Sequence, residues 1–418
     1  MHLIDRVEIK GFWGNHAILI DMKDDYNFVI GANGSGKTTM FNLIAGVLQG
    51  NKSILAKHEF DSIKIILKSP NSRKKPSIEA IKDKDVPFFL VNYKITENSS
   101  EKPFNYELSD MDILEGFNPS TIRLRSRLIG NMAAGRTLNK HLTELVNLTW
   151  LSVQRGNATN EITDPLDHKL EDLSNRLVRY LSAVGKQVNR LYESFQEQVF
   201  LSLLSTERSA SLAIPAAKKV EKEKLALLQI FAQFSIDKKN YSQKIEDHFS
   251  AIEKLNSKIT HETHLSIDEY MTIIDLKRIE KSVDFWEQVT IEKNKLLAPR
   301  DKFMGLLNKL MQKKELTLNE RNEIVITTQS GKYLTTRQLS SGEKQILIIF
   351  GEALLQENKT YIYMADEPEL SLHIDWQEYL ATNIKTLNPS AQVIFATHSP
   401  DVVGALQENI IPMERCIK

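Results

Sequence analysis

Cysteine is nearly absent from this chain: among 418 residues, Cys416 is the single one. One thiol excludes an internal disulfide framework and a zinc site built from the usual spaced cysteines. Net charge is absent too, because 54 lysines and arginines balance 54 aspartates and glutamates. The chain therefore lacks the overall basic charge that is typical of dedicated nucleic-acid-binding proteins. Cys416 is interpreted as an incidental small side chain.

Long apolar runs are also missing. Stretches such as 346–350 fall far short of the roughly 20 apolar residues that a membrane-spanning helix needs. The N-terminus is charged and has no signal-peptide pattern, so we expect a cytoplasmic protein. With 41% hydrophobic and 26% charged residues, the chain is long enough for two domains or for one large domain with an insertion.

The composition and the spacing of apolar residues change twice along the sequence. Residues 1–163 contain short stretches of β-branched and aromatic residues, which predicts strands with turns between them. Residues 164–314 are poor in Gly and Pro and repeat apolar residues at spacings of three and four, which predicts helices. Residues 315–418 again contain patterns that predict strands, together with stretches that predict helices. We therefore predict an α/β fold in which a β-rich N-terminal lobe and a mixed C-terminal segment flank a helical insertion.

Individual elements follow from the same patterns. Pro299 is expected to break the helices of the insertion. The insertion is either a compact helical subdomain or a short coiled-coil arm, and Gly185 together with an irregular heptad favours the compact form. A hairpin is expected to turn near Gly331, and helices are expected after Gly36 and through Leu355. Strands are expected at 2–12, 17–22, 26–30, 62–67, 88–95, 360–365 and 391–397.

The stretch GANGSGKTT, which begins at Gly31, has the spacing of the phosphate-binding loop G-x-x-x-x-G-K-[ST] and lies between a predicted strand and a predicted helix. Glycines let backbone N–H groups converge on phosphate oxygens, and the helix N-terminus adds positive partial charge. Lys37 supplies a charge for the β- and γ-phosphates, and the Thr38 hydroxyl is a predicted Mg²⁺ ligand. The predicted nucleotide ligands are Asn33, Gly34, Ser35, Gly36, Lys37, Thr38 and Thr39.

Two further polar groups follow predicted strands. In YIYMADEPELSLH the adjacent acids are Asp366, a predicted Mg²⁺ ligand, and Glu367, which would orient and deprotonate the attacking water. In ATHSP, His398 follows a strand, and its imidazole is predicted to reach the γ-phosphate or the water. Glu367 and His398 are therefore the predicted catalytic residues.

Together with LSSGEKQ (339–345), these motifs resemble those of the ABC-type ATPase heads of SMC, RecF and OLD-family proteins. They resemble most the stand-alone AAA family ATPases of bacterial anti-phage systems. The resemblance covers the two ends of the chain and implies an ABC-type P-loop head with ATP and Mg²⁺ as cofactors. It also implies that Ser340, Ser341 and Gly342 bind the γ-phosphate held by a second subunit, in a head-to-head dimer or higher oligomer. A D-loop would follow at 370–373. By capping preference alone, the same serines are a helix N-cap.

Other assignments rest on weaker signals. The resemblance places a Mg²⁺- or water-sensing glutamine before the insertion, a metal role that Gln154 in TWLSVQRG would fill; an exposed strand end is the alternative. Phe12 or Trp13 would stack on adenine or belong to the core. The basic clusters RLRSR (123–127) and SRKK (72–75) are either nucleic-acid contacts or solvated faces.

The resemblance implies that the protein binds and hydrolyses ATP and regulates a separate effector, a nuclease or toxin, in anti-phage defence. The ATPase subunits of PARIS, Septu or retron-linked systems are the examples. Only 18 residues follow Pro400, so we expect no TOPRIM nuclease domain in this chain. The alternatives are a DNA-repair or chromosome-type ATPase that clamps DNA, and a slow ATP-dependent scaffold that sequesters a toxin. No membrane partner is expected.

Overall fold

The computed structural model describes residues 1–70, 72, 74–86, 88–98, 102–109, 137–152, 165–204, 217–259 and 266–418. These residues form two compact units. The first unit, here called the head, comprises 1–178 and 300–418, and the second comprises 179–299. The predicted insertion, 164–314, is wider at both ends than the second unit, and its boundaries stay a prediction.

The N-terminal part of the head is a six-stranded antiparallel sheet in the order β2-β1-β4-β5-β6-β7. Alternating residues of β4 are buried, as expected for a sheet that covers a core with one face. The strand patterns predicted β1, β2, β4 and β6 and missed β5 and β7. The bounds are β1 Leu3–Phe12, β2 His16–Asp21, β4 Ser62–Lys68, β5 Ser77–Lys82, β6 Leu90–Thr96 and β7 Phe104–Ser109.

A second sheet in the head is parallel throughout, in the order β14-β3-β13-β12-β8. β13 is buried at every residue, as is typical of a parallel strand covered on both faces. Because the strands are parallel, their carboxyl ends meet at one edge of the sheet. The bounds are β3 Tyr26–Ile30, β8 Leu148–Leu151, β12 Tyr361–Asp366, β13 Ala391–Ala396 and β14 Ile410–Pro412.

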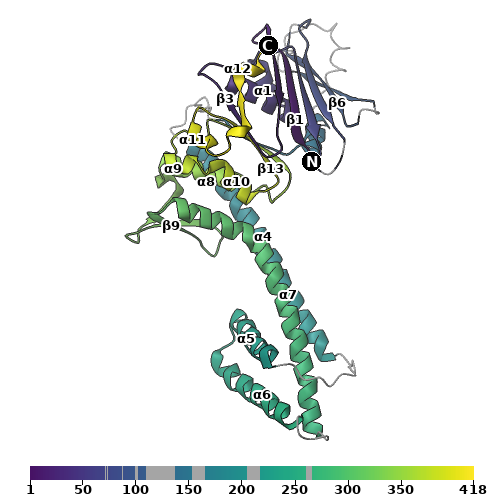
Figure 1. The fold of residues 1–418 in the computed structure, drawn as a ribbon, viewed down its shortest axis with the longest axis vertical. Coiled ribbons are helices and arrows are strands. Elements are labelled where there is room, and N and C mark those ends of the chain that lie inside the picture. The colour runs from purple at the N-terminus through teal and green to yellow at the C-terminus, as the bar shows by residue number, and fades with distance from the viewer. Residues whose placement is uncertain are drawn as a thin grey trace, which may run out of the picture. The chain divides into compact units, whose positions relative to one another are not determined.

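Helix α1 (Lys37–Gln49) lies between the two sheets of the head (Figure 1). It contacts β4 of the antiparallel sheet as well as β8, β12 and β13 of the parallel sheet. Its buried residues join those of both sheets in one hydrophobic cluster. This packing fixes the N-terminus of α1 at the carboxyl edge of the parallel sheet.

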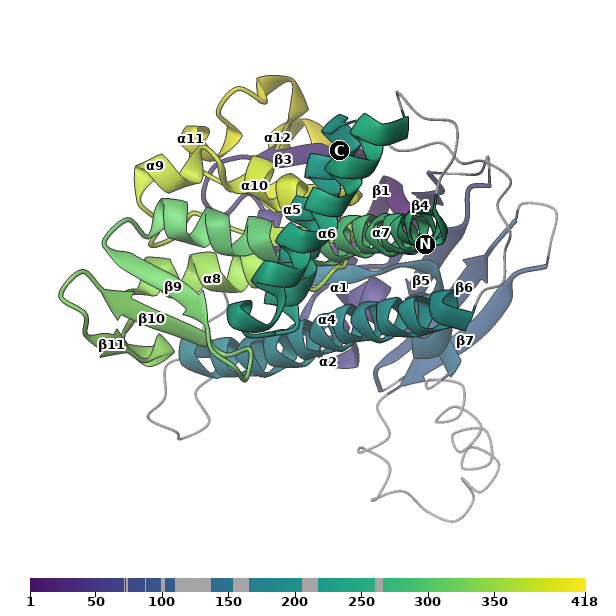
Figure 2. The same ribbon diagram turned by 90° about the horizontal axis from the view of Figure 1, so that it is seen from below.

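The remaining elements of the head are a small sheet and several helices. β9, β10 and β11 form a separate three-stranded sheet (Figure 2), with the predicted turn at Gly331. Helix α8 follows this small sheet and packs against α10. The bounds are α2 Lys52–Lys57, β9 Lys314–Leu318, β10 Ile324–Thr328, β11 Tyr333–Leu334, η3 Thr336–Gln338, α8 Ser341–Leu354, α9 Ile374–Gln377, α10 Leu380–Leu387, α11 Pro400–Val403, η4 Gln407–Asn409 and α12 Met413–Cys416.

The second unit is helical. Helices α4 and α7 each have residues in both units, whereas α5 and α6 lie wholly in the second. Phe195 of α4, Ile230 of α5 and Trp286 of α7 share one buried cluster, and a second cluster joins α6 to α7. The second unit therefore has buried clusters of its own, while the 40 and 44 residues of α4 and α7 are lengths typical of a coiled-coil arm, so the structure combines features of both alternatives. The bounds are α4 Pro165–Leu204, α5 Ala217–Gln233, α6 Lys238–Ile259 and α7 Ile267–Leu310.

One helix prediction is wrong. α7 continues through Pro299 instead of breaking there. Proline removes one backbone hydrogen bond, but Phe303 and Leu307 are fully buried on the following turns and hold the helix by packing. The predicted fold class, an α/β ATPase head with a helical insertion, is confirmed. Among the described residues, no helix has the length and apolar character that crossing a membrane requires.

Candidate active site

The phosphate loop (31–39) joins β3 to α1 at the carboxyl edge of the parallel sheet. Gly34 and Gly36 have φ angles of 79° and 91°, which side-chain-bearing residues rarely adopt. A Cβ on Gly36 would lie 2.8 Å from the Phe12 ring. Both glycines are therefore required by the backbone path of the loop. Asn33 and Gly34 are exposed, whereas Ser35 and Thr39 are half-buried.

The ammonium group of Lys37 is held inside the phosphate loop. It donates hydrogen bonds to the carbonyl oxygens of Gly31 at 2.9 Å and Ala32 at 3.2 Å. It also lies 2.7 Å from Nε2 of His398. Burial lowers the pKa of Lys37, and the nearby carboxylates, first of all Glu367, oppose this shift. Because an ammonium group has only donors, Nε2 of His398 must accept, which places the imidazole proton on Nδ1.

Thr38 and Asp366 form the pair that fits a magnesium ion. The Thr38 hydroxyl donates to Oδ2 of Asp366 at 2.7 Å. The other oxygen, Oδ1, is buried and receives no hydrogen bond from any described residue. Burial raises the pKa of Asp366, which a bound cation would reverse. Two protein oxygens suit Mg²⁺, which usually takes its other ligands from water and phosphate.

Glu367 and His398 face each other across the ends of β12 and β13. Oε1 of Glu367 lies 3.6 Å from Nε2 of His398, and both side chains are partly exposed. Glu367 has a φ of 46°, in the left-handed region that a non-glycine residue rarely adopts. Its backbone N–H donates to the Ala396 carbonyl of the neighbouring strand and fixes this conformation. The structure thus brings the two predicted catalytic residues together beside Lys37.

The buried Glu369, which the sequence analysis missed, holds the histidine loop. Its Oε1 accepts hydrogen bonds from the Thr397 hydroxyl at 2.6 Å and from the His398 backbone N–H at 3.0 Å. It also accepts from the Ser399 backbone N–H at 3.3 Å. Glu369 therefore orients His398 from within the same DEPEL stretch. The only signal in the sequence was that Glu369 is the third acidic residue of DEPEL, two positions after Glu367.

A second missed residue comes from the end of the chain. β14 pairs with β3, and α12 follows it, so that Glu414 lies beside the phosphate loop. Its carboxylate accepts a hydrogen bond from the Ala32 backbone N–H at 3.1 Å. Hydrogen bonds from its own backbone and from Ala32 lower the pKa of Glu414. The first turn of the loop is thereby supported by a residue nearly four hundred positions away.

Phe12 and Trp13 have different environments in the structure. Phe12 is fully buried, which places it in the core, whereas Trp13 is 45% exposed. The Trp13 ring lies 4.7 Å from that of Phe12, centroid to centroid, and borders Gly36. Trp13 alone is thus placed at the surface beside the phosphate loop, and its stacking on adenine stays a prediction.

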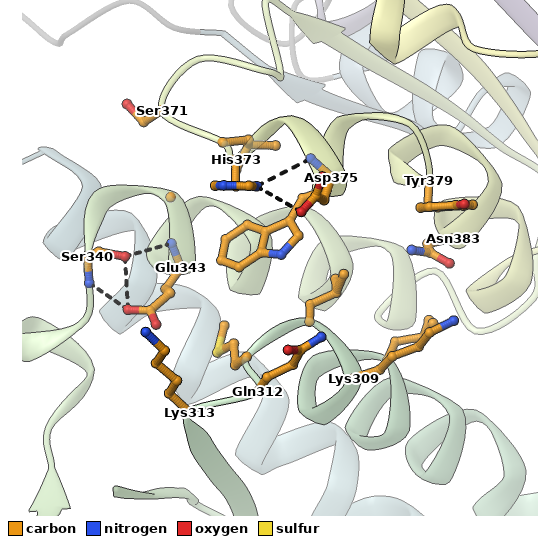
Figure 3. A pocket seen from close by; sticks show the side chains of 16 residues that line it. Lys309, Gln312, Lys313, Ser340, Glu343, Ser371, His373, Asp375, Tyr379 and Asn383 are labelled. Carbon is orange, nitrogen blue, oxygen red and sulfur yellow. Dashed lines mark hydrogen bonds and ion pairs between the residues drawn. The ribbon is translucent and has the colours of Figure 1, made fainter. Parts of the chain in front are cut away.

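The signature motif (339–345) forms the N-terminus of α8. Ser340 is its N-cap, and Ser340 and Glu343 form a reciprocal capping box (Figure 3). Ser340 and Ser341 are exposed. Gln345 donates to the Pro368 carbonyl at 2.9 Å and so ties the motif to the loop after β12. A cavity of about 980 Å³ opens between this motif, the D-loop (370–373) and the end of α7.

Gly342 has a packing role that its sequence did not reveal. A Cβ at this position would lie 2.4 Å from the Ser371 carbonyl oxygen of the D-loop. The sequence analysis assigned this glycine to the approach of a phosphate. In the structure it permits the close approach of α8 to the D-loop, so the two motifs are packed as one piece.

Gly342→Ala is expected to destabilise the head, because the added methyl group forces α8 away from the D-loop backbone. Overpacking of this kind costs about 1–3 kcal/mol of unfolding free energy, measured by urea denaturation. Gly305→Ala is the matched control, because no atom lies within 4 Å of its missing Cβ. The control should gain roughly 1 kcal/mol from helix propensity. An equal gain in both variants would contradict the packing role.

Some of the weaker assignments fall on residues that the structure does not describe. Gln154 and the RLRSR cluster (123–127) lie outside the described residues. In the second basic cluster, Arg73 also lies outside them, and Lys75 forms an ion pair with Asp5 at 2.7 Å. This pairing favours the solvated-face interpretation for Lys75.

A phosphate loop, a strand-end acid pair and a strand-end histidine at one edge of a parallel sheet define a P-loop ATPase site. The chain belongs to the AAA ATPase domain family, whose pattern matches residues 3–403. It is a nucleotide-binding ATPase by this membership.

Solved Smc head domains are similar in structure. One from Pyrococcus furiosus, with an extended coiled coil and bound to the C-terminal domain of ScpA, has 16% identity and a TM-score of 0.43, covering 99% of this chain and 93% of its own. An Smc head bound to the C-winged helix domain of ScpA has 14% identity and a TM-score of 0.45, covering 98% and 94%. One from Pyrococcus yayanosii has 17% identity and a TM-score of 0.42, covering 99% and 95%.

Proposed function

We propose that this protein hydrolyses ATP between two heads, each supplying its phosphate loop to one nucleotide and its signature motif to the other. The observation that carries this proposal is the separation of two phosphate-binding features. The phosphate loop contacts His398, Asp366 and Glu414, whereas Ser340 is exposed on α8 and contacts Glu343. A signature serine that caps its own helix and faces outward suits a nucleotide on a second copy of the chain.

Each residue of the site has a role in this proposal. Lys37 exchanges its contacts with the loop carbonyls for contacts with the β- and γ-phosphates. Thr38 and Asp366 would hold Mg²⁺, which would supply positive charge beside the phosphates. Glu367 accepts a proton from the attacking water, and the His398 imidazole forms a hydrogen bond with the γ-phosphate or the water once Lys37 has moved to the phosphates. Glu369 keeps His398 in position through its backbone N–H.

Ser340→Arg is expected to abolish ATP-dependent dimerisation, because an arginine at the N-cap fills the space that the partner's phosphate must enter. The test is sedimentation or light scattering with Mg-ATP in a Glu367→Gln background, which retains the nucleotide. Ser330→Arg, on the exposed turn before β11, is the matched control and should dimerise normally. If Ser340→Arg also dimerises normally, Ser340 is only a helix cap and the proposed dimer is wrong.

We further propose that the nucleotide state of the dimer regulates a separate effector, a nuclease or toxin, in bacterial anti-phage defence. The motif set described above supports this assignment by its resemblance to the ATPases of such systems. A DNA clamp would instead need a basic surface, and its DNA affinity would fall steeply with salt. Purification of the native complex, with a salt series of DNA binding, separates the two: a co-purifying effector and no salt-dependent DNA binding support the first.

A further inference from the structure

Two neighbouring residues of the signature motif, Glu343 and Lys344, carry opposite charges and form ion pairs with two different elements of the head. Glu343 pairs with Lys314, the first residue of β9 and four residues beyond the end of α7. Lys344 pairs with Asp167 in the first turn of α4. Adjacent residues of one motif are thus tied to the start of α4 and to the strand that follows α7.

In the first pair, Glu343 also forms hydrogen bonds with Ser340. Nζ of Lys314 donates to both carboxylate oxygens of Glu343, at 2.7 and 2.6 Å. Oε2 of Glu343 also accepts from the backbone N–H of Ser340 at 2.8 Å and from its hydroxyl at 2.9 Å. Burial alone would raise the pKa of Glu343, but the hydrogen bonds from Lys314 and Ser340 outweigh it and the net shift is downward. An ionised Glu343 is therefore a fixed link between Lys314 and Ser340.

The second pair is more deeply buried. The Lys344 side chain is only 8% exposed, and its Nζ lies 2.6 Å from Oδ1 of Asp167. The oxygen is not aligned as a hydrogen-bond acceptor, so charge attraction holds this contact. Two turns further along α8, Glu352 accepts hydrogen bonds from both terminal nitrogens, Nη1 and Nη2, of Arg176 in α4. Two charge pairs therefore link α8 to the first part of α4, at Asp167 and Arg176.

We propose that Lys314 and Asp167 are positioning residues that set the orientation of Ser340, so that a shift of α4 or α7 alters the signature motif. This inference rests on the proposed function, because Ser340 acts on the partner's nucleotide. The second unit is then regulatory. A partner that binds it and shifts α4 or α7 changes, through these two ion pairs, how Ser340 contacts the nucleotide of the other subunit. The phosphate loop is not touched by either pair, so ATP binding to the single head is independent of them.

The test compares Lys314→Met and Asp167→Asn in the full-length chain. ATPase turnover is expected to fall about 10- to 100-fold, since a misplaced group costs up to about 10²-fold. ATP-dependent dimerisation weakens in parallel, while affinity for a fluorescent ATP analogue in dilute protein changes less than about twofold. Lys314→Arg and the charge exchange Asp167→Lys with Lys344→Asp are expected to restore turnover, because each keeps an opposite charge at both positions.

Lys68→Met is the matched control. Lys68 of β4 pairs with Asp5 of β1 and with Asp24 in the turn before β3, and its side chain is 20% exposed, close to the 19% of Lys314. Turnover and dimerisation of Lys314→Met equal to those of this control would overturn the positioning role. An equal loss of nucleotide affinity and turnover, without rescue by Lys314→Arg, would overturn it too and indicate a merely structural residue. Wild-type protein that stays monomeric with ATP would overturn the proposed dimer, and the inference with it.

Discussion

Lys37→Ala is expected to abolish ATP binding. Lys37 is 5% exposed, and its ammonium group lies among loop carbonyls and near the carboxylates of Asp366, Glu367, Glu369 and Glu414. Without it, these negative groups face the triphosphate with no compensating charge. Truncating one partner of a buried charge pair costs about 2–5 kcal/mol, which is a loss of affinity of roughly 30- to 4000-fold.

The measurement is calorimetric titration with Mg-ATP and with Mg-ADP. Lys385→Ala provides the control, because Lys385 is a largely buried lysine of the same head that pairs with Asp25. This control should retain wild-type affinity. Tight ATP binding by folded Lys37→Ala would show that the loop does not bind phosphate as assigned.

Glu367→Gln is the second large expected effect: ATP is bound but turnover falls by about 10²–10⁴-fold. The amide keeps the size of the side chain and loses the basic oxygen that takes the proton from water. Removal of a negative charge beside the γ-phosphate should leave ATP affinity unchanged or raise it. The predicted signature is thus a split between binding and turnover.

Single-turnover hydrolysis with radiolabelled ATP measures this split. Glu357→Gln, a surface glutamate that pairs with Lys359, should hydrolyse ATP at the wild-type rate. Normal turnover by the Glu367→Gln protein would refute the assignment of Glu367 as the base. Glu369, the next carboxylate of the same stretch, would then be the candidate base.

The chemistry-bearing residues could be predicted because each lies in a contiguous motif next to a strong strand pattern. Lys37, Asp366, Glu367 and His398 come from three segments, and parallel strands bring them to one edge. That step needs only the rule that ligands bind at the carboxyl ends of such strands. The buried apolar runs of β12 and β13 supplied the strand assignment.

The supporting contacts could not be predicted, because they join residues that are distant in sequence and have no pattern of their own. Glu414 meets Ala32, and Lys314 meets Glu343, only after the chain has folded. Gly342 shows the same limit, since the carbonyl oxygen of Ser371 that requires a glycine lies on another loop. The helix through Pro299 was missed because local propensity was outweighed by packing.

The central claim is that each active site is shared by two copies of the chain, and subunit mixing tests it most directly. Lys37→Ala retains an intact signature motif, and Ser340→Arg retains an intact phosphate loop, so each protein alone should be inactive. In an equimolar mixture, only a dimer of the two variants has a complete site, and it has one instead of two, which predicts recovery of up to about half of the wild-type ATPase activity. A mixture no more active than its two components would contradict the shared site.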